Sequence, residues 1–70
     1  MIKTVRNKIE NWILDRLKQE GTHSYYSLLR QFPNAWKPND LHLCLESLSA
    51  TGRIIKHRDT PNPSYELPHG

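Results

Sequence analysis

The start of the chain carries hydrophobic residues at the spacing of an amphipathic helix. Between Thr4 and Glu20 the apolar positions are Val5, Ile9, Trp12, Ile13 and Leu17. Thr4 is the expected N-cap, because a threonine hydroxyl can accept a hydrogen bond from a backbone N–H of the first turn. Gly21 is the expected end, since glycine readily adopts the left-handed conformation that follows a last helical turn. The pattern predicts a first helix from near Thr4 to Glu20.

A second and shorter segment shows the i, i+3, i+4, i+7 pattern of a helix with one apolar face. Its apolar positions are Tyr25, Leu28, Leu29 and Phe32. Ser24 precedes them and is an N-cap candidate. Pro33 is expected to stop this helix, because proline lacks the backbone N–H and disfavours helical geometry in the residue before it.

A third segment repeats the same spacing after a turn at residues 34–37. Pro38 suits the first helical position, where the N–H that proline lacks has no partner in the helix. Asp40, in the first turn, complements the helix dipole. The apolar positions are Leu41, Cys44, Leu45 and Leu48. Gly52 is the expected end of this third helix.

The pattern changes again after Gly52. Residues 53–58 are β-branched and basic, residues 59–63 are turn formers, and residues 64–67 alternate polar and apolar side chains. This order predicts a terminal β-hairpin. The fold class is therefore mostly α with a small β-hairpin, in one domain over residues 1–70 with a core of roughly residues 4–67, since 70 residues allow one small core.

This succession of helices and hairpin resembles the winged helix-turn-helix family. The residues that carry the resemblance are Leu28-Leu29, Leu41-x-x-Cys44-Leu45-x-x-Leu48, Thr51-Gly52-Arg53-Ile54 and Tyr65-Glu66-Leu67. The resemblance implies a three-helix winged-helix domain, whose third helix enters the DNA major groove and whose hairpin, the wing, contacts phosphates or the minor groove. A shared fold does not establish a shared function, so the surface has to be argued separately.

Composition and charge narrow the class of protein. The chain has ten Lys and Arg against seven Asp and Glu, and this net charge of +3 favours an anionic partner. The apolar runs are far shorter than the roughly 20 residues that a membrane-spanning helix needs. The N-terminal residues do not resemble a secretory signal, so a cytoplasmic location is expected.

The sequence lacks the usual signs of catalysis or metal binding. Its one cysteine, Cys44, occupies an apolar helix position, where a free thiol behaves as a small hydrophobic group. The four histidines do not follow a zinc-ligand spacing. Gly-rich phosphate loops and the usual hydrolase motifs do not occur. We therefore expect neither an enzyme nor a cofactor.

The surface chemistry predicts where nucleic acid would bind. The third helix carries no Lys or Arg, although Asn39 and His42 can form hydrogen bonds with base edges. Positive charge lies at the start of the first helix, before the third helix and on the hairpin, where we expect Lys56 and Arg58 to contact phosphates. Solubility alone is the competing explanation for these charges. The predicted binding residues are Lys37, Asn39, His42, Arg53, Lys56 and Arg58.

The aromatic residues allow fewer assignments. Trp12, Tyr25 and Tyr65 are expected to be structural, and Tyr26 is expected to be partly exposed. For Trp36 two roles stay open, core packing and stacking on a base or a partner side chain.

These observations favour a small DNA-binding, transcription-regulatory protein of bacterial or phage type. The alternative is a protein-interaction or dimerisation module, because the third helix carries Asp40 and Glu46 and an outward-facing Leu43. RNA binding through the basic hairpin is a third possibility that the sequence does not separate from DNA binding. A homodimer would suit a DNA-binding protein, since two copies can bind a palindrome.

Overall fold

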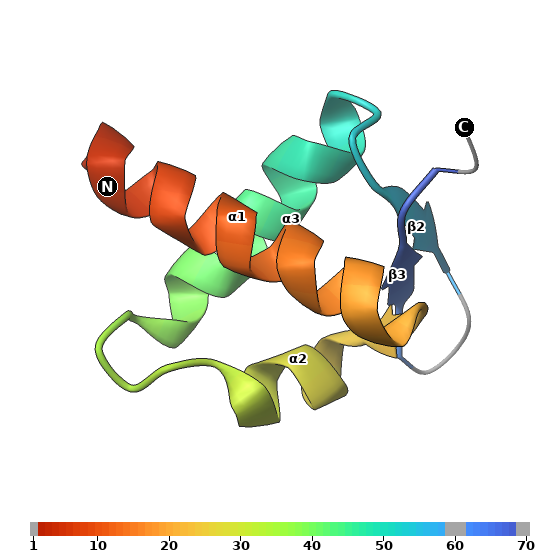
Figure 1. Cartoon of the computed structure of the whole chain (residues 1–70), viewed down its shortest axis with the longest axis horizontal. Coiled ribbons are helices and arrows are strands. Elements are labelled where there is room, and N and C mark those ends of the chain that lie inside the picture. The colour runs from red at the N-terminus through yellow and green to blue at the C-terminus, as the bar shows by residue number, and fades with distance from the viewer. Residues whose placement is uncertain (1, 59–61, 69–70) are drawn as a thin grey trace.

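The computed structural model describes residues 2–58 and 62–68, which form three helices and a small antiparallel sheet (Figure 1). The elements are α1 (Lys3–Glu20), β1 (His23–Ser24), α2 (Tyr25–Gln31), α3 (Pro38–Ala50), β2 (Ile55–His57) and β3 (Ser64–Glu66). The mostly helical class and the terminal pair of strands are as the sequence predicted. Residues 59–61 of the expected turn lie outside the described residues.

The predicted cap of the first helix is wrong. Lys3 is the first residue of α1, and Ile2 is the N-cap, with extended backbone and without a side-chain cap. The N–H of Arg6 donates to the carbonyl of Ile2 at 2.9 Å. Because the helical hydrogen bonds start there, Thr4 lies inside the first turn and cannot cap it. The other end is as predicted: Gly21 has a φ of 84° and donates its N–H to Leu17 at 2.9 Å.

The boundaries of the two shorter helices follow the expected local chemistry. The hydroxyl of Ser24 accepts a hydrogen bond from the N–H of Ser27 at 3.1 Å, which makes Ser24 the N-cap of α2. Pro38 is the first residue of α3. Beyond the C-terminus of α3, Gly52 has a φ of 77°, a conformation that glycine adopts without steric cost.

The sheet contains a strand that the sequence did not predict. Its order is β1-β3-β2, so β3 lies between the short β1 and the expected partner β2. His23 of β1 pairs with Tyr65 of β3. The N–H of Tyr25 donates to the carbonyl of Pro63 at 2.9 Å, which ties the start of α2 to the same segment. A two-residue strand is too short to show an alternating pattern, so β1 could not be predicted from the sequence.

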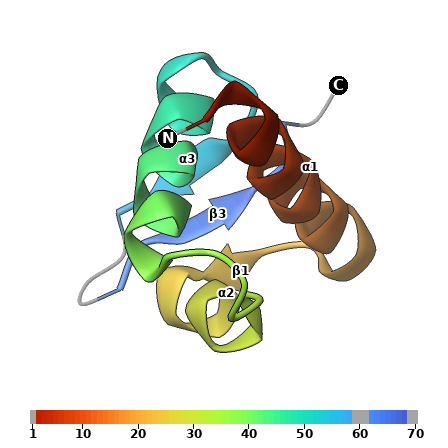
Figure 2. The ribbon, with the colours of Figure 1, turned by 90° about the vertical axis from the view of Figure 1, so that its left-hand side faces the viewer.

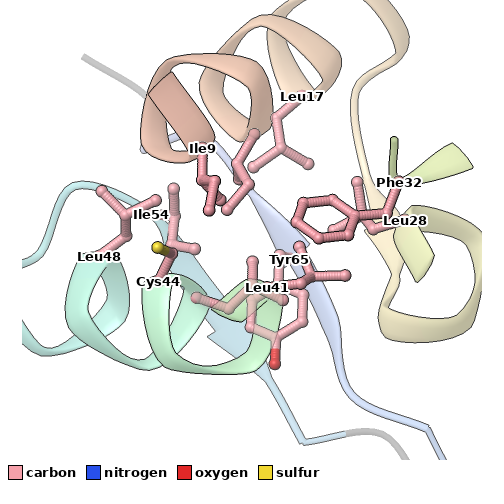
Figure 3. Close-up of a cluster of buried hydrophobic side chains, with 11 residues drawn as sticks. Ile9, Leu17, Leu28, Phe32, Leu41, Cys44, Leu48, Ile54 and Tyr65 are labelled. Atoms are coloured by element: carbon pink, nitrogen blue, oxygen red, sulfur yellow. The ribbon is translucent and has the colours of Figure 1, made fainter. Parts of the chain in front are cut away.

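The three helices and the sheet enclose a single apolar core (Figures 2 and 3). Figure 2 shows α1 and α3 side by side, with α2 below them and the hairpin running behind α3. The core residues are Ile9, Ile13, Leu17, Leu28, Phe32, Leu41, Cys44, Leu45, Leu48, Ile54 and Tyr65. Figure 3 shows Tyr65 of β3 beside Leu41 at the edge of this cluster, which joins the sheet to all three helices.

Candidate nucleic-acid interface

The outward face of α3 is defined by the residues that its inward face buries. Leu41, Cys44, Leu45 and Leu48 are at most 1% exposed. With 3.6 residues per turn, the opposite side of the helix presents one row of residues spaced four, three and four apart. We call this row the outward stripe, and its members are Asn39, Leu43, Glu46 and Ala50. Leu43, in its middle, is 46% exposed, as the sequence predicted.

The register of the hairpin decides which of its side chains reach α3. Lys56 pairs with Tyr65, so both side chains point to the same face of the sheet, the face that contributes to the core. Because side chains alternate along an extended chain, Ile54 and Arg58 share this face with Lys56, whereas Ile55 and His57 point away. Ile54 is buried, Lys56 is partly buried and Arg58 is exposed. Exposure therefore increases along this face of the hairpin, from Ile54 to Lys56 and then to Arg58.

Glu46 is the acidic centre of the side of α3 that faces the hairpin. The ammonium group of Lys56 donates to Oε1 of Glu46 at 2.8 Å. This hydrogen bond, and after it the positive charges of Lys56, His42 and Arg58, hold the pKa of Glu46 below its ordinary value. The structure thus brings together three of the predicted binding residues, Lys56, Arg58 and His42, around one carboxylate. A shallow hollow of about 460 Å³ separates this half of α3 from β2.

Arg53 does not join this group. Its guanidinium lies 3.8 Å from Oε1 of Glu10 on α1. Arg6 lies 3.4 Å from the other oxygen of the same carboxylate and donates a hydrogen bond to the hydroxyl of Ser47 at 2.5 Å. The Glu10 side chain is only 10% exposed, so this cluster forms part of the contact between α1 and α3. This cluster could not be predicted from the sequence, because Glu10 lies among polar residues at the edge of the apolar row of the first helix.

Lys37 and Asn39 lie at the N-terminal end of α3. Lys37 is the N-cap residue, its side chain is exposed, and it lines a hollow with Ile2 and Val5 of the α1 end. Asn39 is exposed on the outward stripe. Lys37 is thus at one end of α3, and Lys56 and Arg58 are beside the opposite half of the helix.

Aromatic side chains of α2 contact His42 of α3. The rings of Tyr25 and Tyr26 meet edge to face at 5.7 Å, and Tyr25 meets the ring of His42 in the same way at 6.4 Å. Tyr26 is 52% exposed, as predicted. Trp36, for which two roles were open, packs against the core, with its ring 5.5 Å from Phe32. Tyr25 was missed as a neighbour of His42, because the two residues come together only in the folded chain.

Reactive and metal-binding groups are sparse in the part of the chain that the structure describes. Cys44 is a free thiol, and burial is the main reason that its pKa is raised. Residues 2–58 and 62–68 contain no cluster of three His, Cys, Asp or Glu that would hold a metal ion. Within the same residues, none of the helices has the length and apolar character that crossing a membrane requires.

Comparisons with models of protein families, with curated proteins and with solved structures found no match to this chain. The fold defines a small, mostly helical domain with a three-stranded antiparallel sheet. Its function has to be argued from the surface of α3 and the hairpin.

Proposed function

We propose that the chain is a winged-helix DNA-binding protein that places α3 in the major groove and contacts phosphates with Lys37, Lys56 and Arg58. The observation that carries the proposal is the placement of these cations. Lys37 lies at the N-terminal end of α3, and Lys56 and Arg58 lie along one side of it. The described residues leave the outward face of α3 uncovered (Figure 2). Cations beside a protruding helix are suited to the two backbones that border a groove.

The ion pair between Lys56 and Glu46 is compatible with phosphate binding. The Glu46 side chain is 45% exposed, and ion pairs that water can reach contribute only about 0–1 kcal/mol. A DNA phosphate can therefore compete for Lys56 at small cost.

The element order also supports the proposal. Two consecutive helices, α2 and α3, are joined by residues 32–37 and followed by a hairpin, which is the arrangement implied by the resemblance to winged helix-turn-helix proteins. The tie between Tyr25 and Pro63 holds the hairpin against the start of α2. The helix pair and the hairpin would consequently approach DNA as one rigid unit.

The test is a salt titration of binding to random-sequence duplex DNA. Three phosphate contacts predict a dissociation constant of about 1–100 μM near physiological salt, with log K falling against log salt at a slope of about −2.7. The K56A/R58A double variant is expected to bind about tenfold more weakly and to lose about 1.8 of that slope. The matched control is K8A/K18A, which removes the same charge from exposed positions on α1.

The outcomes separate the candidate functions. Equal losses in both double variants would mean that net charge alone attracts the protein to DNA, and the proposed contact surface would be wrong. Duplex RNA of the same sequence should bind more weakly, because its deep and narrow major groove excludes a helix. Sedimentation of the complex shows whether one copy or two bind, which tests the homodimer.

A second candidate function is binding of a protein partner through the same face. Leu43 and Ala50 are exposed on the outward stripe, and Ala50 also lines the adjacent hollow. Exposed apolar groups that lie together favour protein contacts. Absence of duplex binding at about 50 mM salt would favour this candidate, since phosphate contacts are strongest at low salt.

A further inference from the structure

The residues of the outward stripe differ from those that recognise guanine. Guanine presents two acceptors in the major groove, N7 and O6, and is read by Arg or Lys. Residues 38–50, which form α3, include neither Arg nor Lys. Lys56 points toward the stripe, but the proposed function assigns its ammonium group, which pairs with Glu46 in the free protein, to a phosphate rather than to a base edge. The surface that would meet base edges thus lacks an unpaired donor with a full positive charge.

Glu46 does not separate the two kinds of base pair. Its pKa is lowered, chiefly by the hydrogen bond from Lys56, and an ionised carboxylate can only accept hydrogen bonds. Adenine N6 and cytosine N4 are both donors in the major groove, so A·T and G·C pairs each offer this carboxylate one partner.

The other members of the stripe match adenine and thymine. Asn39 is exposed near the start of α3, and an asparagine amide forms two hydrogen bonds with adenine N6 and N7. Leu43 and Ala50 offer apolar surface, which suits the methyl group of thymine. At 1.5 Å per residue, the stripe from Asn39 to Ala50 extends about 16 Å, roughly the length of five base pairs.

We propose that α3 selects A·T-rich duplex DNA, with Asn39 bound to adenine and Leu43 in contact with thymine methyl groups. This inference rests on the proposed function, because it names the sequence class that the same surface would prefer. It concerns base edges in the major groove, whereas the phosphate contacts of Lys37, Lys56 and Arg58 are independent of sequence.

The experiment compares three alternating duplexes of equal length at one salt concentration: dA-dT, dG-dC and dA-dU, the last of which lacks the thymine methyl groups. Fluorescence anisotropy of labelled duplexes gives the affinities. We expect dA-dT to bind about tenfold or more tightly than dG-dC, and about threefold more tightly than dA-dU.

Two variants assign these differences to residues. L43A should abolish the difference between dA-dT and dA-dU, whereas I2A, which also removes an exposed apolar side chain, should retain it. N39A should narrow the preference for dA-dT over dG-dC, because it removes the amide that pairs with adenine. Circular dichroism of each variant checks that the fold is intact.

The possible failures are distinguishable. If no duplex binds at low salt, the proposed function itself fails. If all three duplexes bind equally, or if dG-dC binds best, the protein contacts DNA without the selectivity inferred here and the sequence preference is wrong. If dA-dT is preferred but L43A and I2A respond alike, the assignment to Leu43 is wrong.

Discussion

Two carboxylates, one facing each side of α3, form ion pairs with cations but differ in how far they are buried. Toward α1, Glu10 holds Arg6 and Arg53, and its side chain is 10% exposed. Toward the hairpin, Glu46 holds Lys56 and is 45% exposed. We refer to these groups as the closed cluster and the open cluster.

The comparison shows that a positive charge near α3 is not by itself a sign of a ligand contact. In the closed cluster, Arg6 also donates to Ser47 of α3, so its guanidinium links two helices. In the open cluster, water reaches the ion pair, and a phosphate can replace Glu46 as the partner of Lys56. The clusters differ in the burial of the carboxylate and not of the cations, because Arg6 and Arg53 are 48% and 51% exposed and Lys56 is 24% exposed.

The largest effect is expected from Tyr65, which lies beneath the open cluster. Burial, followed by the negative charge of Glu46, raises the pKa of Tyr65 to about 12. The unfolded chain loses this proton near pH 10 and the folded chain only near pH 12. The stabilisation is thus fully present below pH 10 and is lost as the pH rises, by about 2 kcal/mol at pH 12.

Urea denaturation between pH 9 and pH 12 measures this loss, with Y65F as the control. The phenylalanine variant keeps the ring in the core but has no phenol to titrate. Its stability should fall by about 2 kcal/mol less over the same range. Parallel curves for the two proteins would show that the Tyr65 hydroxyl is accessible to solvent.

A smaller effect separates the two carboxylates themselves. E10A should lower the free energy of unfolding by about 1 kcal/mol, because it leaves two arginines without their shared partner at a helix contact. E46A should change it by less than about 0.5 kcal/mol, since its ion pair is open to water. Both positions lie within helices, so the gain in helix propensity from alanine is similar in the two variants. Equal losses in urea denaturation would contradict the distinction between the clusters.

The smallest effect should come from Arg53. R53A is expected to change the affinity for random duplex DNA by less than about twofold, whereas R58A should weaken it by about threefold. Each variant removes one positive charge from an exposed side chain close to the hairpin. If the two variants weaken binding equally, Arg53 leaves Glu10 to contact DNA, and the assignment of Arg53 to a structural role is wrong.

Much of the fold was predictable from local chemistry. Apolar spacing predicted the three helices, and Ser24, Pro38 and the two glycines predicted most of their boundaries, because caps and stops depend on residues only a few positions apart. Thr4 shows the limit of this reasoning. A hydroxyl near the start of a helix caps it only if the helical hydrogen bonds begin at that residue, and here they begin at Ile2.

The candidate site divides in the same way. The sequence by itself determined that α3 has no Lys or Arg and that Leu43 points outward, since both follow from composition and helical periodicity. Only the tertiary structure decided which cations lie beside α3. The register of β2 against β3 directs Lys56 toward Glu46, and the packing of α1 against α3 directs Arg53 toward Glu10. Both pairings join residues ten or more positions apart, so they depend on how the elements pack rather than on any local pattern.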